Sequence, residues 1–347
     1  MTSSSSVVTS SGGRVTMSVV GLPVRARDAL SKRVAIFTDE TGWHTRRLQR
    51  ALRERGAEGR CIDLEHCHVD TTAHAHGLVL PGFGAALPDA AIVRGIAGGS
   101  FEQVTKRLAI LHLLRELGVP VYNDARAIER SVDKGMTSLL LHAAGVRTPP
   151  TWVTESPDLA RACVEREAAA GHAVVVKPLF GSQGNGIVRA GWVDGRFVAL
   201  PSLAGEGSPF GGVAYLQRFV PAGNDADDGG HDWRVLVVGG SAVAAMRRVS
   251  RHWVHNVAQG ARCEAQPLDD ASGIALARIA ERAAAALGLD YAGVDLMPTP
   301  DGPTVIEVNG VAAWRGLQRV TPFDIARVLV DDLIERRLPA RVASATA

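Results

Sequence analysis

Residues 291–321 read YAGVDLMPTPDGPTVIEVNGVAAWRGLQRVT, and this stretch decides the fold. Two short apolar runs, at 292–296 and 304–308, lie on either side of a segment rich in Pro and Gly at 298–303. Apolar runs separated by such turn formers predict two adjacent strands joined by a tight loop.

These two strands carry three oxygen-bearing side chains. Asp295 is in the first strand, while Glu307 and Asn309 are two residues apart in the second and point to the same face. The residues expected on the opposite face are apolar: Val294, Leu296, Ile306 and Val308. They indicate buried strands with the acids in a crevice, rather than a hairpin whose polar face meets water. Converging oxygens of this kind suit a Mg²⁺ ion that carries nucleotide phosphates, so we predict a metal site.

Length and composition narrow the class of protein. A chain of 347 residues is long enough for two or three domains with their own cores. The net charge of +2 is too small to argue for nucleic acid as a partner. No apolar run approaches the roughly 18 residues that a membrane-spanning helix needs. We therefore expect a soluble globular protein with neither a nucleic-acid nor a membrane partner.

The N-terminus and the cysteines indicate the cellular compartment. Residues 1–30 are rich in Ser, Gly and Val and lack the apolar core of a signal peptide, so we expect a disordered tail. The four cysteines are not closely paired, which is typical of a reducing environment. Both features predict a cytoplasmic protein.

The next hundred residues alternate between strand and helix patterns. Strands are expected at 33–37, 61–64, 78–80 and 91–94, and helices at 43–55 and 101–117. This alternation predicts a small parallel α/β domain. The inward stripe of the second helix is expected to contain Phe101, Val104, Leu108, Leu111 and Leu114.

Two motifs in this region invite other interpretations. Gly82 and Gly84 follow a strand as in a dinucleotide-binding turn, but Leu87 stands in place of the third Gly and Pro88 interrupts the helix. Several Cys and His residues at 61–76 could suggest zinc, but no pair has zinc-ligand spacing. We interpret the first as an ordinary turn and the second as surface loop and partial core.

The middle of the chain contains a glycine-rich loop between two strands. A helix is expected from residue 133, with Met136, Leu139, Leu140 and Ala143 inward; a strand at 149–153 and a helix at 158–170 follow. The strand 172–178 ends in Lys177, and FGSQGNG (180–186) leads into a strand at 187–190. A Walker A loop would open a helix, so we predict instead a flap whose backbone N–H groups fold over phosphates, and not a plain hairpin turn.

The last third is expected to form antiparallel strands covered by helices. Three consecutive strands are predicted at 213–220, 232–238 and 241–249. A helix over 269–287, ended by Gly288, leads into the strand that carries Asp295. A final helix is expected at 323–337.

Lys134 and Lys177 complete the chemistry, because a lysine is a point charge suited to phosphate oxygens. Either lysine alone would more simply be a solvated surface charge. In order along the chain, however, the two lysines, the glycine flap and the acidic trio predict a Mg-nucleotide site.

At this point the chain resembles the ATP-grasp superfamily, and within it the RimK-type α-L-glutamate ligases. The motifs that carry the resemblance are SVDKGMTSLLLHAAGVRTPPT (131–151), VVVKPLFGSQGNGI (174–187), LQRFV (216–220), HDWRVLVVGG (231–240), AGVDLM (292–297) and VIEVNG (305–310). The resemblance implies an ATP-grasp fold, in which two α+β subdomains grip ATP, preceded by a parallel α/β pre-ATP-grasp domain. The expected boundaries are a tail at 1–30, the pre-ATP-grasp domain at 31–128, the small subdomain at 129–212 and the large subdomain at 213–347.

The resemblance also implies roles for individual residues. The nucleotide-binding set is Lys134, Lys177, the flap residues Gly181, Ser182, Gln183 and Gly184, the adenine hinge Gln217, Arg218, Phe219 and Val220, the ribose-side acid Asp232, and Asn256 near the phosphates. Arg234 and Arg248 are the catalytic candidates that steady the transferring phosphate, and Asp295, Glu307 and Asn309 are the metal ligands. The implied cofactors are ATP and Mg²⁺ or Mn²⁺.

Three positions depart from the family pattern. Arg218 stands where many relatives have Glu in the hinge, which puts the usual side-chain contact to the nucleotide in doubt. Arg247 replaces a common acid beside Arg248. Residues 310–316 (GVAAWRG) replace the family's Ala-Ser-Pro-Gly turn beside the substrate, so we expect a different acceptor from the ribosomal tail of the namesake.

The reaction implied by the resemblance is ATP-dependent carboxylate–amine ligation through an acyl phosphate. We expect glutamate to be added to a small-molecule or peptide carboxylate, by a protein that can form homo-oligomers as its relatives do. Basic residues expected at the rim suit an anionic substrate, unless they are only solvated charges: Arg247, Arg248, Arg251, His252, His255, Arg315 and Arg319. The alternatives are a phosphotransferase that uses the same nucleotide site, or a catalytically silent ATP-binding regulatory protein.

Overall fold

The computed structural model describes residues 31–181, 184–205, 207–222, 229–257 and 260–338, and the expected tail at 1–30 lies outside them. A parallel four-stranded sheet comes first, in the order β2-β1-β5-β6. Its elements are β1 (Lys32–Phe37), β2 (Ala57–Ile62), β5 (Ala90–Val93), β6 (Val121–Tyr122), and the helices α1 (Trp43–Glu54) and α2 (Phe101–Glu116). The predicted parallel α/β domain is confirmed.

Details of this region differ from the predictions. The run expected as a strand at 61–64 ends β2, and Leu64–His66 form the 3₁₀ helix η1. The strand expected at 78–80 is β4 (Leu78–Val79), which pairs with β3 (His68–Val69) outside the parallel sheet.

The predicted inward face of α2 is confirmed for Leu111 and Leu114, which are buried, but it is wrong for Phe101 and it missed Arg107 and Ile110. Phe101 is 82% exposed, and the buried residues are Arg107, Ile110, Leu111 and Leu114. Arg107 turns inward because its guanidinium donates to the carbonyls of Ala97 (2.6 Å) and Gly98 (2.7 Å). Because Arg107 bonds to these carbonyls, the buried face of α2 contains an arginine and differs from the purely apolar stripe.

The second sheet is antiparallel, in the order β10-β9-β8-β11-β7, with α5 packed on it. Its elements are β7 (Thr151–Thr154), α5 (Pro157–Ala169), β8 (Ala173–Lys177), β9 (Val188–Val193), β10 (Arg196–Val198) and β11 (Ala214–Arg218). We expected the strand at 213–220 to form consecutive antiparallel strands with the two that follow it in the chain. It instead pairs with β7 and β8, so the second sheet extends past the expected boundary at residue 212.

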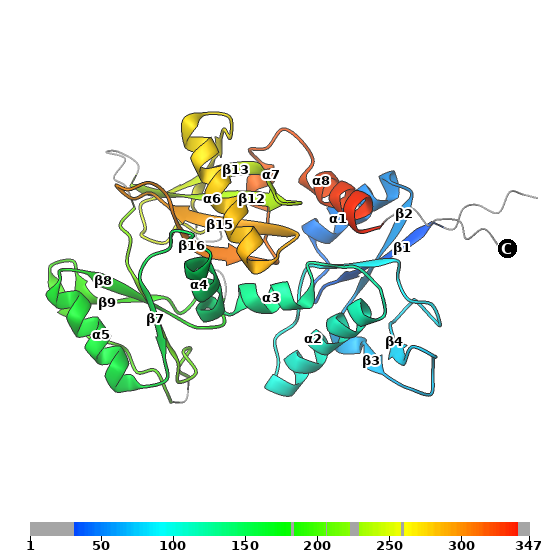
Figure 1. The fold of residues 1–347 in the computed structure, drawn as a ribbon, viewed down its shortest axis with the longest axis horizontal. Helices are drawn as coiled ribbons and strands as arrows, with labels where there is room; N and C mark the ends of the chain where they lie inside the picture. Colours follow the sequence, from blue (N-terminus) through cyan, green and yellow to red (C-terminus); the bar gives the residue numbers. More distant parts are fainter. Residues whose placement is uncertain (1–30, 182–183, 206, 223–228, 258–259, 339–347) are drawn as a thin grey trace, which may run out of the picture. The chain divides into compact units, whose positions relative to one another are not determined.

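The third sheet is also antiparallel, in the order β14-β13-β12-β15-β16. Its elements are β12 (Gly230–Val238), β13 (Ser241–Ser250), β14 (Arg262–Gln266), β15 (Tyr291–Met297) and β16 (Thr304–Asn309). Helix α6 (Ala271–Leu287) packs on this sheet and ends at Gly288, whose φ is +74°, as predicted (Figure 1). The neighbouring strands predicted from residues 291–321 are therefore confirmed, while β14 was not predicted.

Further helices of the described chain are α3 (Ala125–Val132), α4 (Lys134–Ala143), α7 (Arg315–Gln318) and α8 (Ile325–Asp332), and α8 continues into the π-helical turn η3 (Leu333–Arg337). Helix α8 packs against α1, so the last α-helix of the described chain contacts the first (Figure 1). Among the described residues, no helix combines the length and apolarity required to cross a membrane.

Helix α4 also buries a different face from the one predicted. Met136 is 43% and Leu139 is 62% exposed, while Thr137, Ser138 and Leu141 are buried. Two hydroxyls explain this orientation: the Thr137 hydroxyl donates to the Arg130 carbonyl (2.6 Å), and that of Ser138 shares a hydrogen bond with the Tyr215 hydroxyl (2.9 Å).

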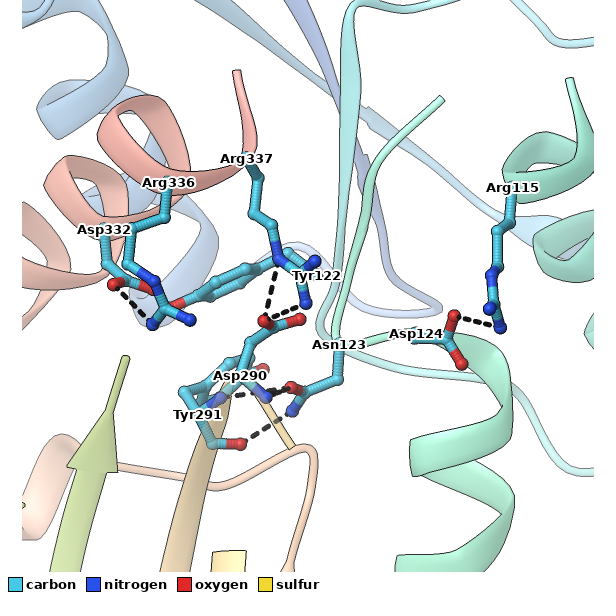
Figure 2. A network of polar contacts seen from close by, with 9 residues as sticks. All are labelled: Arg115, Tyr122, Asn123, Asp124, Asp290, Tyr291, Asp332, Arg336 and Arg337. Atoms are coloured by element: carbon cyan, nitrogen blue, oxygen red, sulfur yellow. Dashed lines mark hydrogen bonds and ion pairs between the residues drawn. The ribbon is translucent and has the colours of Figure 1, made fainter. Parts of the chain in front are cut away.

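A buried asparagine joins the first sheet to the third (Figure 2). The Asn123 amide donates to the carbonyls of Tyr291 (2.7 Å) and Gly310 (2.6 Å). Its side-chain oxygen accepts from the backbone N–H groups of Asp290 (2.6 Å) and Tyr291 (3.1 Å). One side chain therefore fixes the start of β15 and the residue after β16, the two strands that carry the predicted metal ligands.

Candidate nucleotide-binding site

One pocket lies between the second and third sheets. Its lining contains most of the predicted nucleotide-binding residues: Lys134, Lys177, Gly181, Gly184, Gln217, Arg218, Phe219, Val220, Asp232 and Asn256. Arg248, Asp295 and Glu307 line the same pocket, with apolar side chains of Val175, Ile187, Met297 and Ile306. Residues separated by more than 170 positions in the chain thus meet around one space.

Lys177 is the more enclosed of the two lysines. Its ammonium donates to the side-chain oxygen of Gln217 at 2.8 Å. The Gln217 amide in turn donates to Thr151 (3.3 Å) and Tyr215 (3.2 Å), which fixes its orientation. Burial lowers the pKa of Lys177 to about 8, although the nearby Glu307 carboxylate opposes this shift. Lys177 therefore carries a positioned charge that a phosphate could complement.

Lys134 lies at the beginning of α4 and reaches the flap. Its ammonium donates to the carbonyls of Gly181 (2.9 Å) and Leu179 (3.4 Å). Burial lowers its pKa, and Glu307 again opposes the shift. Lys134 thus connects the first residues of the flap to the pocket.

The glycine flap lines one side of the pocket, between β8 and β9. Gly184 and Gly186 have φ values of +73° and +72°, which other residues rarely adopt. A side chain at Gly186 would also approach Pro178 at 3.1 Å and Pro209 at 3.3 Å. The predicted contacts Ser182 and Gln183 lie outside the described residues.

The predicted hinge is the end of β11. The backbone N–H groups of Arg218 and Phe219 donate to the carbonyls of Pro150 (2.8 Å) and Ala173 (2.9 Å). The N–H of Val220 bonds to none of the described residues, which leaves it available to a ligand. The Arg218 guanidinium bonds to Glu167 on α5 at 2.7 Å, so this replacement for the family's Glu has its own partner within the protein.

A buried network of two acids and two arginines closes the other side. The Arg248 guanidinium donates to both oxygens of Asp232 (2.6 and 2.5 Å) and also lies 3.2 Å from Asp295. Arg234 donates to both oxygens of Asp295, each at 2.7 Å. Burial alone would raise the pKa of Asp295, but the two arginines outweigh it and hold the pKa below its usual value. Asp295 is therefore ionised and already shared between two cations.

This network changes the expectation for Asp232, the predicted ribose-side acid. Asp232 and Arg248 lie opposite each other on β12 and β13, so the two side chains meet over a bidentate contact. Both carboxylate oxygens point to the arginine, and Asp232 is 3% exposed. The geometry makes Asp232 first of all a partner of Arg248.

The predicted metal ligands share one face of β15 and β16. Asp295 lies directly opposite Glu307, and Gly293 lies opposite Asn309. Within the described part of the chain, Glu307 makes no hydrogen bond or ion pair. The Asn309 amide donates to the Gly293 carbonyl at 3.4 Å, which leaves its oxygen available. The oxygens of two carboxylates and one amide are ligands that fit Mg²⁺. Asp295 would then be shared between the cation and the two arginines.

Two observations refine this metal-site prediction. No group of three or more His, Cys, Asp and Glu side chains in the described ranges is arranged to hold a metal, and the predicted trio has only two acids. The register of β15 and β16 shifts between Asp295 and Leu296, so Val305 pairs with Leu296 and Ile306 is the extra residue of a bulge. Ile306 therefore lines the pocket, and Val305 occupies the core position that was predicted for Ile306.

The expected basic rim divides into two groups. Arg248 and His255 are buried, at 2% and 4% exposure, and so belong to the interior rather than the rim. The four predicted rim residues that are exposed are Arg251, His252, Arg315 and Arg319, and none of them is among the residues that line the pocket. Arg247 lies 3.7 Å from Glu264.

Gly310, Ala312 and Trp314 of the unusual turn at 310–316 are buried inside the protein. Trp314 is 1% exposed and contacts the rings of Trp43 and His44 at centroid distances of 4.9 and 4.7 Å. The Trp314 backbone N–H donates to His44 (3.2 Å), whose pKa is lowered to about 4 by burial and by two nearby arginines. The turn thus anchors the first sheet, and Arg315 is the basic side chain that it exposes.

Sequence reasoning did not single out several residues that line the pocket. Trp253 and Val254 are neighbours of Asn256 in the segment 251–257, and Met297 ends β15. An aromatic residue in a polar loop beside a predicted ligand was the available signal for Trp253. No comparable signal distinguishes Met297 from the core residues of its strand.

Comparison with known protein families decides the class. The model of the RimK-like ATP-grasp domain matches residues 131–333, and that of the RimK pre-ATP-grasp domain matches residues 33–128. The chain belongs to the RimK-like ATP-grasp family. The resemblance seen in the sequence is therefore confirmed, as is the expected fold. The protein is an ATP-grasp ligase, of the class that joins a carboxylate and an amine at the expense of ATP.

Similar proteins have this class of activity in their names. A tetrahydromethanopterin:α-L-glutamate ligase of Methanococcus maripaludis is 36% identical over 70% of this chain and 78% of its own. A probable α-L-glutamate ligase of Halorhodospira halophila is 28% identical over 87% and 94%.

Solved structures show the same fold at lower identity. The ATP-grasp ligase PsnB, in complex with a phosphomimetic variant of its minimal precursor, Mg and ADP, has a TM-score of 0.62 at 23% identity, over 88% of this chain and 98% of its own. A RimK-domain ATP-grasp protein of Sphaerobacter thermophilus has a TM-score of 0.59 at 23% identity, over 86% and 98%.

Proposed function

We propose that this RimK-like ATP-grasp ligase adds glutamate to a carboxylate of a small molecule or peptide, using ATP and Mg²⁺ or Mn²⁺. The observation that carries the proposal is the convergence of Lys134, Lys177, Arg248 and Glu307 on one pocket between two sheets. A nucleotide triphosphate needs this combination of fixed cations and metal-binding oxygens.

The nucleotide binds with its base at the hinge and its phosphates at the lysines. The N–H of Val220, which has no partner among the described residues, and the apolar side chains of Val175 and Ile187 suit an adenine ring. Lys177, held by Gln217, and Lys134, at the start of the flap, bind the phosphates. Gly181 and Gly184 of the flap line the same pocket, and closure of the flap would exclude water, which would hydrolyse an activated intermediate.

Glu307, Asn309 and Asp295 hold the divalent cation. The cation supplies charge neutralisation at the phosphate oxygens during transfer. Arg234 and Arg248 lie beside Asp295 and steady the negative charge that develops as the bond to the phosphate breaks. Asn256, in the same pocket lining, is a polar contact for the phosphates.

The reaction consists of two transfers. An oxygen of the acceptor carboxylate takes the γ-phosphoryl group of ATP, which releases ADP and gives an acyl phosphate. The glutamate amine then attacks the acyl carbon, phosphate leaves, and the amine proton is lost as the amide forms. No protein nucleophile is needed, and the chemistry depends on positioning and on fixed charges.

Glutamate and the acceptor are inferred from two features. The relatives named above are α-L-glutamate ligases, and the exposed side chains of Arg251, Arg315 and Arg319 suit an anionic substrate. The four cysteines are free, which fits a cytoplasmic location.

The proposal is tested by incubating cell extract with the protein, Mg-ATP and isotopically labelled glutamate, followed by mass spectrometry. We expect a labelled adduct that requires both ATP and the protein, and its mass identifies the acceptor. A labelled adduct with a different amino acid, and none with glutamate, would correct the amine. A stable phosphorylated product without any amine would instead support a phosphotransferase.

A further inference from the structure

Three side chains from three segments stack beside the nucleotide pocket. Arg189 is in β9, Phe219 follows β11, and Trp253 lies in the segment 251–257 after β13. The Arg189 guanidinium is 5.3 Å from the centroid of the Phe219 ring and 5.4 Å from that of Trp253. The two rings contact each other edge-to-face at 6.0 Å. We call these three side chains the Arg189 stack.

The Arg189 stack connects the two sheets that form the pocket. Arg189 is in a strand of the second sheet and Phe219 directly follows another strand of that sheet, whereas Trp253 follows a strand of the third. Asp194 fixes the guanidinium from the far side, with contacts of 2.8 and 3.4 Å. A cation over an aromatic face contributes a weak attraction at partly exposed sites. Such a contact can hold a loop closed and still allow it to open.

The segment that Trp253 holds contributes its neighbours to the pocket. Val254, His255 and Asn256 all line it. His255 is buried near Arg248, and Val257 packs against Gly316 of α7. The segment is thus fixed beyond Asn256 by the third sheet and α7, and before Asn256 by the Arg189 stack.

Trp253 and Asn256 are related to different parts of the pocket. Trp253 contacts the hinge residue Phe219, where the base is expected. Asn256 is three residues further on, up to about 10 Å along an extended chain, next to the histidine that lies near Arg248. Trp253, which contacts the hinge, and Asn256, the polar side chain, therefore occupy different positions along the same short segment.

We propose that Trp253 is a positioning residue: by docking on Arg189 and Phe219 it closes the segment 251–257 over the pocket and places Asn256 at the phosphate chain. The proposal rests on the proposed nucleotide role of the pocket. It predicts that loss of the Arg189 stack weakens the binding of phosphates and leaves the binding of the base largely unchanged.

The experiment compares equilibrium binding of AMP-PNP with Mg²⁺ and of adenosine, which lacks phosphates, to the full-length protein. Trp253→Leu is expected to weaken AMP-PNP binding about tenfold, because a correctly placed polar contact contributes roughly 1.4 kcal/mol, and to change adenosine binding less than about twofold. Arg189→Met should act in the same direction, and Arg189→Lys, which keeps the cation, should restore most of the affinity. Trp192→Leu is the matched control, because Trp192 is an exposed tryptophan of β9 outside the pocket.

Three results would contradict the proposal, and thermal unfolding of each variant verifies that it is folded. Equal loss of affinity for AMP-PNP and adenosine would make Trp253 a wall of the base site instead. Unchanged affinity in both Trp253→Leu and Arg189→Met would remove any role in binding. If the wild-type protein bound neither ligand, the proposed function itself would fail, and this inference with it.

Discussion

Asp295 and Glu307 lie opposite each other on neighbouring strands, but their surroundings differ. Asp295 is bonded by Arg234 and lies 3.2 Å from Arg248, whereas Glu307 has no hydrogen-bond or ion-pair partner among the described residues. Lys134 and Lys177 are close enough for the charge of Glu307 to act on them, but neither forms an ion pair with it, so this charge is less compensated than that of Asp295. Glu307 is therefore the carboxylate on which metal binding should depend most strongly.

The substitution Glu307→Gln tests this assignment. We expect the turnover number to fall by about two orders of magnitude or more, because the charge that is removed acts mainly on the metal and the transition state. The melting temperature should stay close to that of the wild type, since the side chain makes no hydrogen bond or ion pair with the described residues that the substitution would remove. Glu116→Gln, at an exposed position of α2, is the control. Turnover near the wild-type value in Glu307→Gln would refute the metal assignment.

The pH dependence of nucleotide binding should depend on Lys177. Burial lowers its pKa to about 8, so the free protein loses this charge as the pH rises through about 8. We expect the affinity for ADP to be highest below that pH and to fall above it. Isothermal titration at several pH values measures the effect. Lys177→Arg keeps its charge and should flatten the profile; an unaltered alkaline decline in that variant would exclude Lys177 as its cause.

At the scale of the elements, the buried side chain of Asn123 positions β15 (Figure 2). Asn123→Ala leaves two carbonyls and two N–H groups without partners, and we expect it to lower the free energy of unfolding by about 2–4 kcal/mol. Tyr122→Phe, which removes one hydrogen bond to Asp332 (2.6 Å), should cost about 1 kcal/mol. Urea unfolding measures both changes, and a loss in Asn123→Ala no larger than in Tyr122→Phe would contradict this role.

The elements were largely predictable from sequence where the pattern is local. The apolar runs around the turn at 298–303 predicted β15 and β16, because strand pairing across a short loop needs no distant information. The bulge that turns Ile306 into the pocket was not predictable, since it depends on the register between the strands. Likewise, the buried face of α4 carries hydroxyls satisfied by Tyr215 and by the Arg130 carbonyl, and hydrophobicity alone selects the wrong side.

Residues of the site were predictable as a set, but their contacts were not. The motifs around Lys134, Lys177 and Glu307 lie in three separate segments, and most of the predicted site residues line one pocket, although Arg234 and Asn309 are not among its lining residues. The contact between Asp232 and Arg248 required the register of β12 and β13. The Arg189 stack required three segments to meet in space, and no local pattern encodes such a meeting.

For the whole molecule, the first sheet and the turn at 310–316 bear on the acceptor. Arg94, after β5, donates to the Ala312 carbonyl (2.8 Å) and to the Tyr291 hydroxyl (3.0 Å). Trp314 packs against α1, so the turn that departs from the family pattern is also the joint between the first and third sheets. The unusual sequence of this turn therefore has a structural role besides any role in substrate choice. For this reason the sequence alone could not attribute the turn to the choice of acceptor.

The central claim is amide formation coupled to ATP, and the most direct test follows both products together. The acceptor-containing fraction is incubated with Mg-ATP, with and without glutamate, and ADP and the glutamyl adduct are quantified for the wild type and for Glu307→Gln. We predict equal amounts of ADP and amide in the wild type, little ADP without glutamate, and neither product in the variant. ADP formation that is independent of glutamate and accompanied by a stable phosphorylated acceptor would contradict the account.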